Sequence, residues 1–392
     1  YPFTPGLHSD EQVEGWRGVT DAVHAASGRI FAQIMHGGRI GHPSLLPGDL
    51  HPVGVSAVRP AGQLFAGEGR VDFETPRELT GAEIEATIAD FATAARNAVE
   101  AGFDGIELHG ANGYLLHQFL ADNTNLRTDE WGGSVENRIR FVVEVVRATS
   151  EAIGGRRVGL RISPSASYND IVEESADEVY PALVDAINPF GLAYLHIGEA
   201  GERALTLELR RRFTGTVILN PFTPDGVTGP DHLPLLDDGT ADALSFGALF
   251  LANPDLPARL RTGGPFNTPD PSTYFGGTEA HAIYAHIKRN VDATATGSHM
   301  YRWMFNMVTG EVRVIVDRAG VDGEPAQARA PWQADDVDGV TWVHTEAPPG
   351  SFVEARIDEV VDDYDFAATA IRVVSAPVPA APRRRTRALP MA

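Results

Sequence analysis

Three polar side chains follow one apolar segment at spacings that suit proton transfer and charge stabilisation. His109, Asn112 and Tyr114 come directly after the apolar run 103–108. In a parallel α/β protein, ligands bind at the carboxyl ends of the strands, where such a run opens into a loop. A histidine and an asparagine at this spacing can donate to one oxygen atom, and the tyrosine can supply a proton. The segment therefore indicates chemistry that puts negative charge on a carbonyl oxygen and a proton on carbon.

Each candidate residue also has a structural interpretation. His109 can be a histidine that satisfies its hydrogen bonds at a strand end, and Tyr114 can be a packing residue with its hydroxyl at the surface. Arg161 lies in an apolar segment, where a salt bridge to a carboxylate is the alternative to a ligand contact. Gln33 can likewise use its amide to satisfy the backbone. Because three suitable side chains gather at one strand end, catalysis is the favoured interpretation for His109.

The composition excludes several classes of protein. The 392 residues include no cysteine, which rules out disulfides, thiolate zinc sites and cysteine-bound iron–sulfur clusters. The formal net charge of -21 disfavours a nucleic-acid partner. No apolar run is long enough to cross a bilayer, so we expect no membrane contact and interpret the protein as cytoplasmic. His36 and His42 have no carboxylate at a spacing that completes a metal site, so we expect no metal.

Short apolar segments alternate with longer amphipathic ones over most of the chain, which predicts an α/β fold with a parallel sheet. The expected strands are 30–35, 105–108, 158–162, 193–197, 216–219 and 243–246, and the expected helices include 80–100 and 135–153. Thr80 and Glu83 form a capping-box pattern at the start of the first of these helices. A closed (β/α) barrel has eight strands, so we expect two further strands before Tyr1.

Two other regions differ from this alternation. Segment 46–76 is rich in glycine and proline and predicts a long excursion above the strand ends, with a hairpin lid. Further along, the β-like segments 312–317, 341–343, 352–357 and 369–374 are separated by turn residues, which predicts a small all-β barrel. The end, 376–392, is rich in proline and arginine and is predicted to be disordered.

Ordered motifs run through the first part of the chain. They include 33–39 (QIMHGGR), 109–114 (HGANGY), 125–138 (NLRTDEWGGSVENR) and 252–256 (ANPDL). Together these motifs resemble the Old Yellow Enzyme family of FMN-dependent ene-reductases, which are TIM barrels that hold FMN at the carboxyl ends of their strands. The resemblance implies that NADPH or NADH reduces the flavin, and that the flavin then passes hydride to the β-carbon of an α,β-unsaturated carbonyl compound.

The resemblance also implies roles for individual residues. Gln33 is expected to hydrogen-bond the pyrimidine edge of the flavin, and Arg161 to lie near flavin N1 and stabilise the reduced ring. His109 and Asn112 are expected to bind the carbonyl oxygen of the substrate, and Tyr114 to donate the proton. Phe275 is expected to contact the substrate.

One departure from the family concerns the phosphate of FMN. Many members carry Phe-Gly-Arg after the last strand, with the arginine on the phosphate, whereas this chain has alanine at the third position, Ala248. We expect the backbone amides of Gly247 and Ala248 to face the phosphate instead, because the phosphate site of such barrels follows strands seven and eight.

The later part of the chain carries a second set of motifs. Segments 314–317 (VIVD), 337–340 (VDGV) and 349–354 (PGSFVE) resemble the TRAM domain that ends ribosomal-protein methylthiotransferases. Those enzymes need cysteine-bound iron–sulfur clusters, so this chain cannot perform their reaction. A TRAM domain contacts RNA or a protein partner. RNA is the minor alternative here because the region is acidic, with Asp335, Asp336, Asp358, Glu359, Asp362 and Asp363.

These observations lead to one main hypothesis. Residues 1–280 are an incomplete flavin-binding TIM-type (β/α) barrel lacking its first two strands, 281–308 a linker, 309–375 a TRAM-like all-β barrel and 376–392 a disordered tail. The protein is then an NAD(P)H:flavin oxidoreductase of the ene-reductase type, with FMN and NAD(P)H as cofactors and a small activated alkene as substrate. The sequence is compatible with a homo-oligomer. The alternative is a catalytically inactive barrel fragment fused to a TRAM-like RNA- or protein-binding module; residues 297–300 (GSHM) match a common cloning scar.

Overall fold

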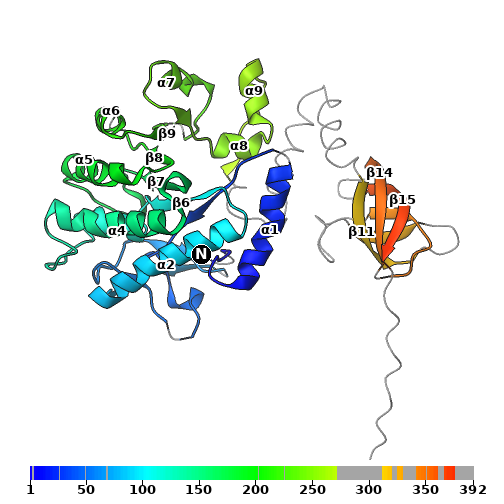
Figure 1. Cartoon of the computed structure of the whole chain (residues 1–392), viewed down its shortest axis with the longest axis horizontal. Helices are drawn as coiled ribbons and strands as arrows, with labels where there is room; N and C mark the ends of the chain where they lie inside the picture. Colours follow the sequence, from blue (N-terminus) through cyan, green and yellow to red (C-terminus); the bar gives the residue numbers. More distant parts are fainter. Residues whose placement is uncertain are drawn as a thin grey trace, which may run out of the picture. The chain divides into compact units, whose positions relative to one another are not determined.

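The computed structural model in Figure 1 divides into two compact units, Tyr1–Phe275 and Gly276–Ala392. It describes residues 1, 4–25, 27–48, 50–67, 69–201, 203–224, 226–271, 311–319, 325–329, 341–349, 351–360 and 366–375. Phe275, the expected linker 281–308 and the expected disordered tail 376–392 lie outside these residues. No helix in the described ranges combines the length and apolar character needed to cross a membrane.

A six-stranded sheet forms the centre of the first unit. Its strands follow chain order and are parallel: β1 (Phe31–Ile34), β6 (Gly105–Gly110), β7 (Val158–Ile162), β8 (Tyr194–Gly198), β9 (Thr216–Asn220) and β10 (Ala243–Leu244). All six strands expected from the apolar runs therefore form. Only β7 has the expected bounds at both ends. β6 continues through His109 and Gly110, β10 is two residues shorter than expected, and the bounds of β1, β8 and β9 differ from the expected ones by one residue.

Helices surround the strands of the first unit (Figure 1). The two expected helices form as α2 (Gly81–Glu100) and α4 (Val135–Ile153), with Thr80 and Ser134 as N-caps. The remaining helices are α1 (Asp10–Ala25), α3 (Leu115–Leu120), α5 (Ala176–Ile187), α6 (Arg203–Arg212), α7 (Pro234–Asp237), α8 (Ala248–Ala252) and α9 (Leu256–Thr262). Short 3-10 turns lie at Pro43–Leu45, Gly155–Arg157, Tyr168–Asp170, Asn188–Phe190 and Pro230–His232.

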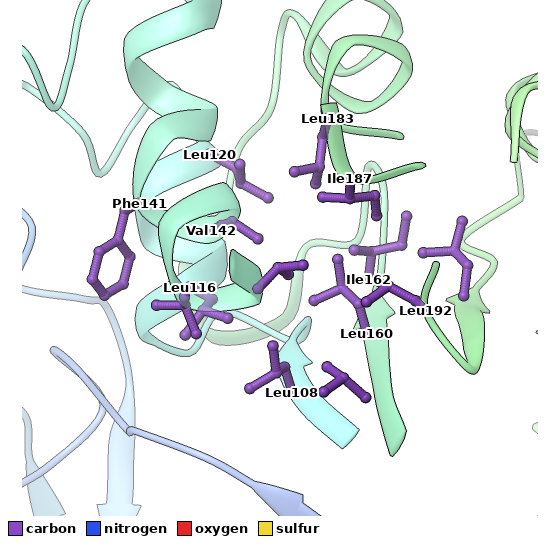
Figure 2. Close-up of a cluster of buried hydrophobic side chains, with 14 of the residues drawn as sticks. Leu108, Leu116, Leu120, Phe141, Val142, Leu160, Ile162, Leu183, Ile187 and Leu192 are labelled. Carbon is purple, nitrogen blue, oxygen red and sulfur yellow. The ribbon is translucent and has the colours of Figure 1, made fainter. Parts of the chain in front are cut away.

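The apolar core lies between the sheet and these helices (Figure 2). Leu108 of β6 and Leu160 and Ile162 of β7 are fully buried against helical side chains. The helical side of the core comes from α3, α4 and α5, with Leu116, Leu120, Phe141, Val142, Leu183 and Ile187. Burying this face fixes which side chains of each strand point the other way, toward the concave side of the sheet, because successive side chains alternate.

The glycine- and proline-rich segment forms four short strands. β3 (Gln63–Phe65) and β4 (Arg70–Asp72) pair as an antiparallel hairpin, as expected, while β2 (Val53–Gly54) pairs in parallel with β5 (Arg77–Glu78). Leu64 and Phe73 form a small apolar cluster with Ile40, against which Tyr114 packs. The hairpin region therefore contacts the strand-end segment that carries the candidate chemistry.

The second unit is an all-β structure. Its strands β11 (Glu311–Arg318), β12 (Ala326–Arg329), β13 (Thr341–His344), β14 (Phe352–Val360) and β15 (Phe366–Ser375) close in the order β11-β12-β13-β15-β14. Four of these strands match the expected β-like segments, whereas β12 was not expected. Every pairing is antiparallel except that of β13 with β15.

Candidate active site

His109 lies inside β6 and not in the loop expected from the sequence. Only 5% of its surface is exposed, and its register partner on β7 is Arg161. Burial, and then the positive charge of Arg161, lowers the pKa of His109 to about 4, so the imidazole is neutral near pH 7. Its Nδ1 atom is buried without a hydrogen-bond partner within the described ranges.

Tyr114 contacts His109 through its ring. The two ring centroids are 4.8 Å apart with an interplanar angle of 68°. Tyr114 is the half-buried N-cap residue of α3, and its hydroxyl hydrogen-bonds the hydroxyl of Tyr1 at 2.9 Å. Burial, and then the Tyr1 hydroxyl, raises the pKa of Tyr114, so the phenol carries its proton at neutral pH. Tyr1 was not among the candidate residues from the sequence.

Asn112 connects these two residues in a left-handed turn. Its φ is 56°, a conformation that asparagine tolerates better than most residues. The loops after β7 hold its backbone: the N–H donates to Ser163 Oγ at 2.9 Å, and the carbonyl accepts from Asn169 Nδ2 at 2.7 Å. Its side chain makes no hydrogen bond to any described residue and so can bind a ligand.

A cluster of buried polar side chains hydrogen-bonds the backbone of this turn. The N–H of Gly113 donates to His117 Nδ1 at 3.0 Å, and His117 Nε2 lies 3.1 Å from Glu173 Oε1. Tyr180 also donates to Glu173, at 2.8 Å. Gly113 itself has φ 82°, and a Cβ there would lie 2.7 Å from the carbonyl oxygen of Tyr168. The turn therefore needs glycine at this position, and its backbone is fixed by fully buried partners.

A second polar layer crosses the sheet from β1 to β10. Gln33 Nε2 donates to Glu107 Oε1 at 2.6 Å, and His196 Nδ1 lies 2.9 Å from Glu107 Oε2. Arg161 contacts the ring nitrogens of His196 through Nη1, and Ser245 Oγ lies 2.9 Å from His196 Nε2. Gln33 and Arg161 both have protein partners of a kind other than expected. Gln33 bonds a carboxylate and not the backbone, and Arg161 contacts an imidazole, feels the charge of Glu107 and forms no ion pair within 4 Å with any described carboxylate.

Burial, hydrogen bonds and neighbouring charges together set the protonation states in this layer. Burial would raise the pKa of Glu107, but hydrogen bonds from His196 and Gln33 bring it below its usual value. Burial lowers the pKa of both Arg161 and His196, and Glu107 acts against this shift in each case. The layer therefore holds a carboxylate, a neutral imidazole and a guanidinium. Glu107 and His196 were missed by the sequence analysis because their importance depends on strand register.

Two further candidate residues, Gly247 and Ala248, follow Ser245 of this layer in the chain. Gly247 and Ala248 begin α8 after β10; Gly247 is exposed with open space where a Cβ would be, and the two backbone N–H groups donate to no described residue.

A cavity of about 850 Å³ runs along β1 toward α2. Gln33 lines it, but His109, Asn112, Tyr114 and Arg161 do not.

Comparison with known proteins assigns the first unit. Residues 1–267 match the NADH:flavin oxidoreductase / NADH oxidase family. The chain belongs to this family. It is therefore related to NAD(P)H-dependent flavin oxidoreductases with a TIM-barrel α/β fold, in agreement with the resemblance noted in the sequence. Residues 309–371 match the TRAM domain, which agrees with the second resemblance.

Several relatives are about 40% identical. A putative 12-oxophytodienoate reductase 11 of Oryza sativa subsp. japonica is 39% identical over 70% of this chain and 77% of its own length. A probable flavin mononucleotide-dependent alkene reductase of Leishmania infantum is 41% identical over 70% of this chain and 77% of its own length. Morphinone reductase, solved in complex with tetrahydroNAD, is 40% identical with a TM-score of 0.67, covering 72% of this chain and 79% of its own. The alternative of a catalytically inactive fragment gains no support from these relatives.

Proposed function

We propose that this chain is an FMN-dependent NAD(P)H oxidoreductase that reduces the activated C=C bond of α,β-unsaturated carbonyl compounds. The observation that carries the proposal is the contact between a neutral buried imidazole, His109, and a protonated phenol, Tyr114, opposite Arg161 in the strand register. The relatives named alkene reductase and 12-oxophytodienoate reductase support this reaction class.

The side chains in the polar layer fit a flavin ring. An isoalloxazine ring presents carbonyl oxygens that need donors and an N–H group that needs an acceptor. Arg161 keeps Nε and Nη2 without hydrogen bonds to described residues, and Gln33 keeps its carbonyl oxygen free while its amide nitrogen donates to Glu107. The free backbone N–H groups of Gly247 and Ala248 suit the phosphate. We therefore propose that these four residues hold FMN.

FMN held by these residues would supply the hydride chemistry that couples NAD(P)H to the alkene. His109 and the Asn112 amide bind the substrate carbonyl oxygen and stabilise the negative charge that develops there; such a donor contributes about 3–4 kcal/mol in other enzymes. The Tyr114 hydroxyl donates the proton to the carbon that becomes electron-rich. The surrounding core keeps His109 neutral, so it donates a hydrogen bond without carrying charge.

We also propose a finer description of the fold. The six parallel strands in chain order correspond to the last six strands of an eight-stranded (β/α) barrel, because that barrel is built from consecutive parallel strands. The domain limits are 1–280, 281–308, 309–375 and 376–392, with the third a TRAM-like β-barrel. We propose that the protein acts in the cytoplasm on a small activated alkene and forms a homo-oligomer, which sedimentation measures.

The experiment has two steps. The flavin-free whole chain is titrated with FMN, and binding is followed by quenching of flavin fluorescence. The loaded protein is then supplied with NADPH or NADH and 2-cyclohexenone, with the saturated ketone cyclohexanone as control. We expect FMN binding and nicotinamide oxidation that depends on the enone. Absence of FMN binding, or equal oxidation with both ketones, would overturn the proposal.

A further inference from the structure

A carboxylate lies beneath the two side chains that we propose to contact the flavin ring. Glu107 is 9% exposed, and it accepts a hydrogen bond on each oxygen, from Gln33 Nε2 at 2.6 Å and from His196 Nδ1 at 2.9 Å. The hydroxyl of Tyr194 on β8 also hydrogen-bonds this carboxylate. A buried carboxylate is unfavourable unless it is hydrogen-bonded and compensated. Glu107 meets both conditions, through these donors and through the charge of Arg161.

The proton positions in this layer follow from the charge of Glu107. An ionised carboxylate only accepts, so His196 must carry its proton on Nδ1. Nε2 of His196 is then an acceptor, and Arg161 Nη1 and Ser245 Oγ both approach it. The same logic fixes the amide of Gln33: its nitrogen faces Glu107, and its carbonyl oxygen faces away.

Glu107 therefore acts on Gln33 and Arg161 in different ways. It orients Gln33 directly and Arg161 through His196. It also places a negative charge near the guanidinium, which partly cancels the field of Arg161 at any ring that Arg161 contacts. The imidazole between them is neutral and adds no charge of its own.

We propose that Glu107 and His196 are positioning residues of the flavin site, which align Gln33 and Arg161 and lower the midpoint potential of the bound flavin. This inference rests on the proposed function, because it requires that FMN binds against Gln33 and Arg161. A more negative potential makes hydride transfer to the alkene more favourable and reduction by NAD(P)H less so. Glu107 thus sets the balance between the two half-reactions.

The first test is Glu107→Gln, which keeps the shape and removes the charge. We expect the ratio of reduced to oxidised FMN affinity to rise on the order of tenfold, which is about 30 mV in midpoint potential for two electrons. Redox titration with indicator dyes measures this shift. The matched control is Glu151→Gln, since Glu151 pairs with Arg147 on the surface with 65% of its side chain exposed. We expect the control to leave the potential unchanged.

A second readout needs no flavin. Nitrogen-15 NMR of the histidine rings reports which nitrogen of His196 carries the proton. We expect the Nδ1–H form in the flavin-free wild type, because Glu107 only accepts at Nδ1 and Arg161, which only donates, approaches Nε2. The Nε2–H form in the wild type, or an unchanged potential in a Glu107→Gln variant that binds FMN, would overturn the inference while leaving the proposed function intact.

If the wild type binds no FMN, the proposed function and this inference fail together. If Glu107→Gln does not fold, His196→Asn replaces it: its amide can still donate to Glu107 but cannot reach Arg161. We then expect FMN to bind at least fivefold more weakly, and binding equal to the wild type would overturn the inference.

Discussion

The chemistry of the site depends on side chains whose protonation states are set by burial. His109 is buried on β6 and faces Arg161, which disfavours a second positive charge. Tyr114 is held neutral by burial and by the hydroxyl of Tyr1. Reduction of an enone puts negative charge on the carbonyl oxygen and a proton on carbon. A neutral hydrogen-bond donor such as His109 suits the first change, and a protonated acid such as Tyr114 suits the second.

Tyr114→Phe should separate proton transfer from hydride transfer to the flavin. The variant keeps the ring that packs against His109 and loses only the hydroxyl, so flavin reduction by NAD(P)H should stay within twofold of the wild type. Reoxidation by the enone should slow by about 10²–10⁴, the usual contribution of a positioned acid. Rapid-mixing measurements of the two half-reactions check this. Equal slowing of both, or of neither, would contradict the assigned role of Tyr114.

The low pKa of His109 makes a prediction about stability and pH. The folded protein holds its pKa at about 4, below the value near 6.5 in an unfolded chain, so only the unfolded state gains a proton between these values. Stability is therefore full above about pH 6.5 and lost as the pH falls toward 4, by roughly 3 kcal/mol from this residue. Urea unfolding of His109→Gln at several pH values should show that its free energy of unfolding falls less steeply with decreasing pH than that of the wild type.

The matched control for this measurement is His51→Gln, because the side chain of His51 is 59% exposed. In this variant the free energy of unfolding should fall with decreasing pH as steeply as it does in the wild type. Some loss should persist in His109→Gln, since burial also lowers the pKa of His36 and His196. A wild-type slope in His109→Gln would show that the imidazole is not held neutral by the fold.

At the scale of elements, helix α2 shows how local signals position the site. The Thr80 side chain accepts from the N–H of Glu83, and the Glu83 side chain accepts from the N–H of Thr80, which completes the capping box expected from the sequence. Ile84, Ile88 and Phe91 then bury one face of the helix in the core. The helix packs against β6, the strand that carries His109.

Thr80→Ala should lower the free energy of unfolding by about 1 kcal/mol, the usual cost of removing an N-cap side chain. Thr93→Ala is the control, because Thr93 lies on the same helix and its hydroxyl, which donates to the carbonyl of Ala89 and accepts from Arg96, takes no part in the cap. The control should change stability by less than half as much. Urea unfolding monitored by circular dichroism measures both variants, and equal effects would contradict the role of the cap.

The elements also show what sequence patterns can and cannot predict. Apolar runs located all six parallel strands, because buried strands leave a strong local signal. Helix α1 was missed because Gly15 and Gly18 lower its helix propensity, and β12 was missed because it is four residues long and rich in alanine. His109 and Tyr114 could be singled out from spacing alone. The contact between Glu107 and His196 could not, because it joins residues far apart in the chain through strand register.

At the scale of the whole molecule, the chain joins two units of different kinds. One belongs to a flavin oxidoreductase family, and the other matches the TRAM domain and closes into a five-stranded barrel. The first unit carries the site that we propose for FMN and an activated alkene, and any partner of the second unit has to tolerate its acidic residues. Charge is the property that most restricts this partner, because the formal net charge of the chain is -21.

The whole chain should not bind RNA. Affinity for a polyanion comes mainly from cations that displace counterions from phosphates, and it falls steeply with salt. Here the region that matches the TRAM domain carries acidic clusters such as Asp335-Asp336 and Asp358-Glu359, which repel phosphates. Filter binding of labelled single-stranded RNA from 50 to 200 mM salt should therefore show no retention above that of an acidic control protein. Retention that weakens as salt rises would instead show phosphate contacts and would make RNA a partner of the second unit. The arginine-rich segment 383–387 is the first place to test in that case, because it is the densest cluster of cations in the chain.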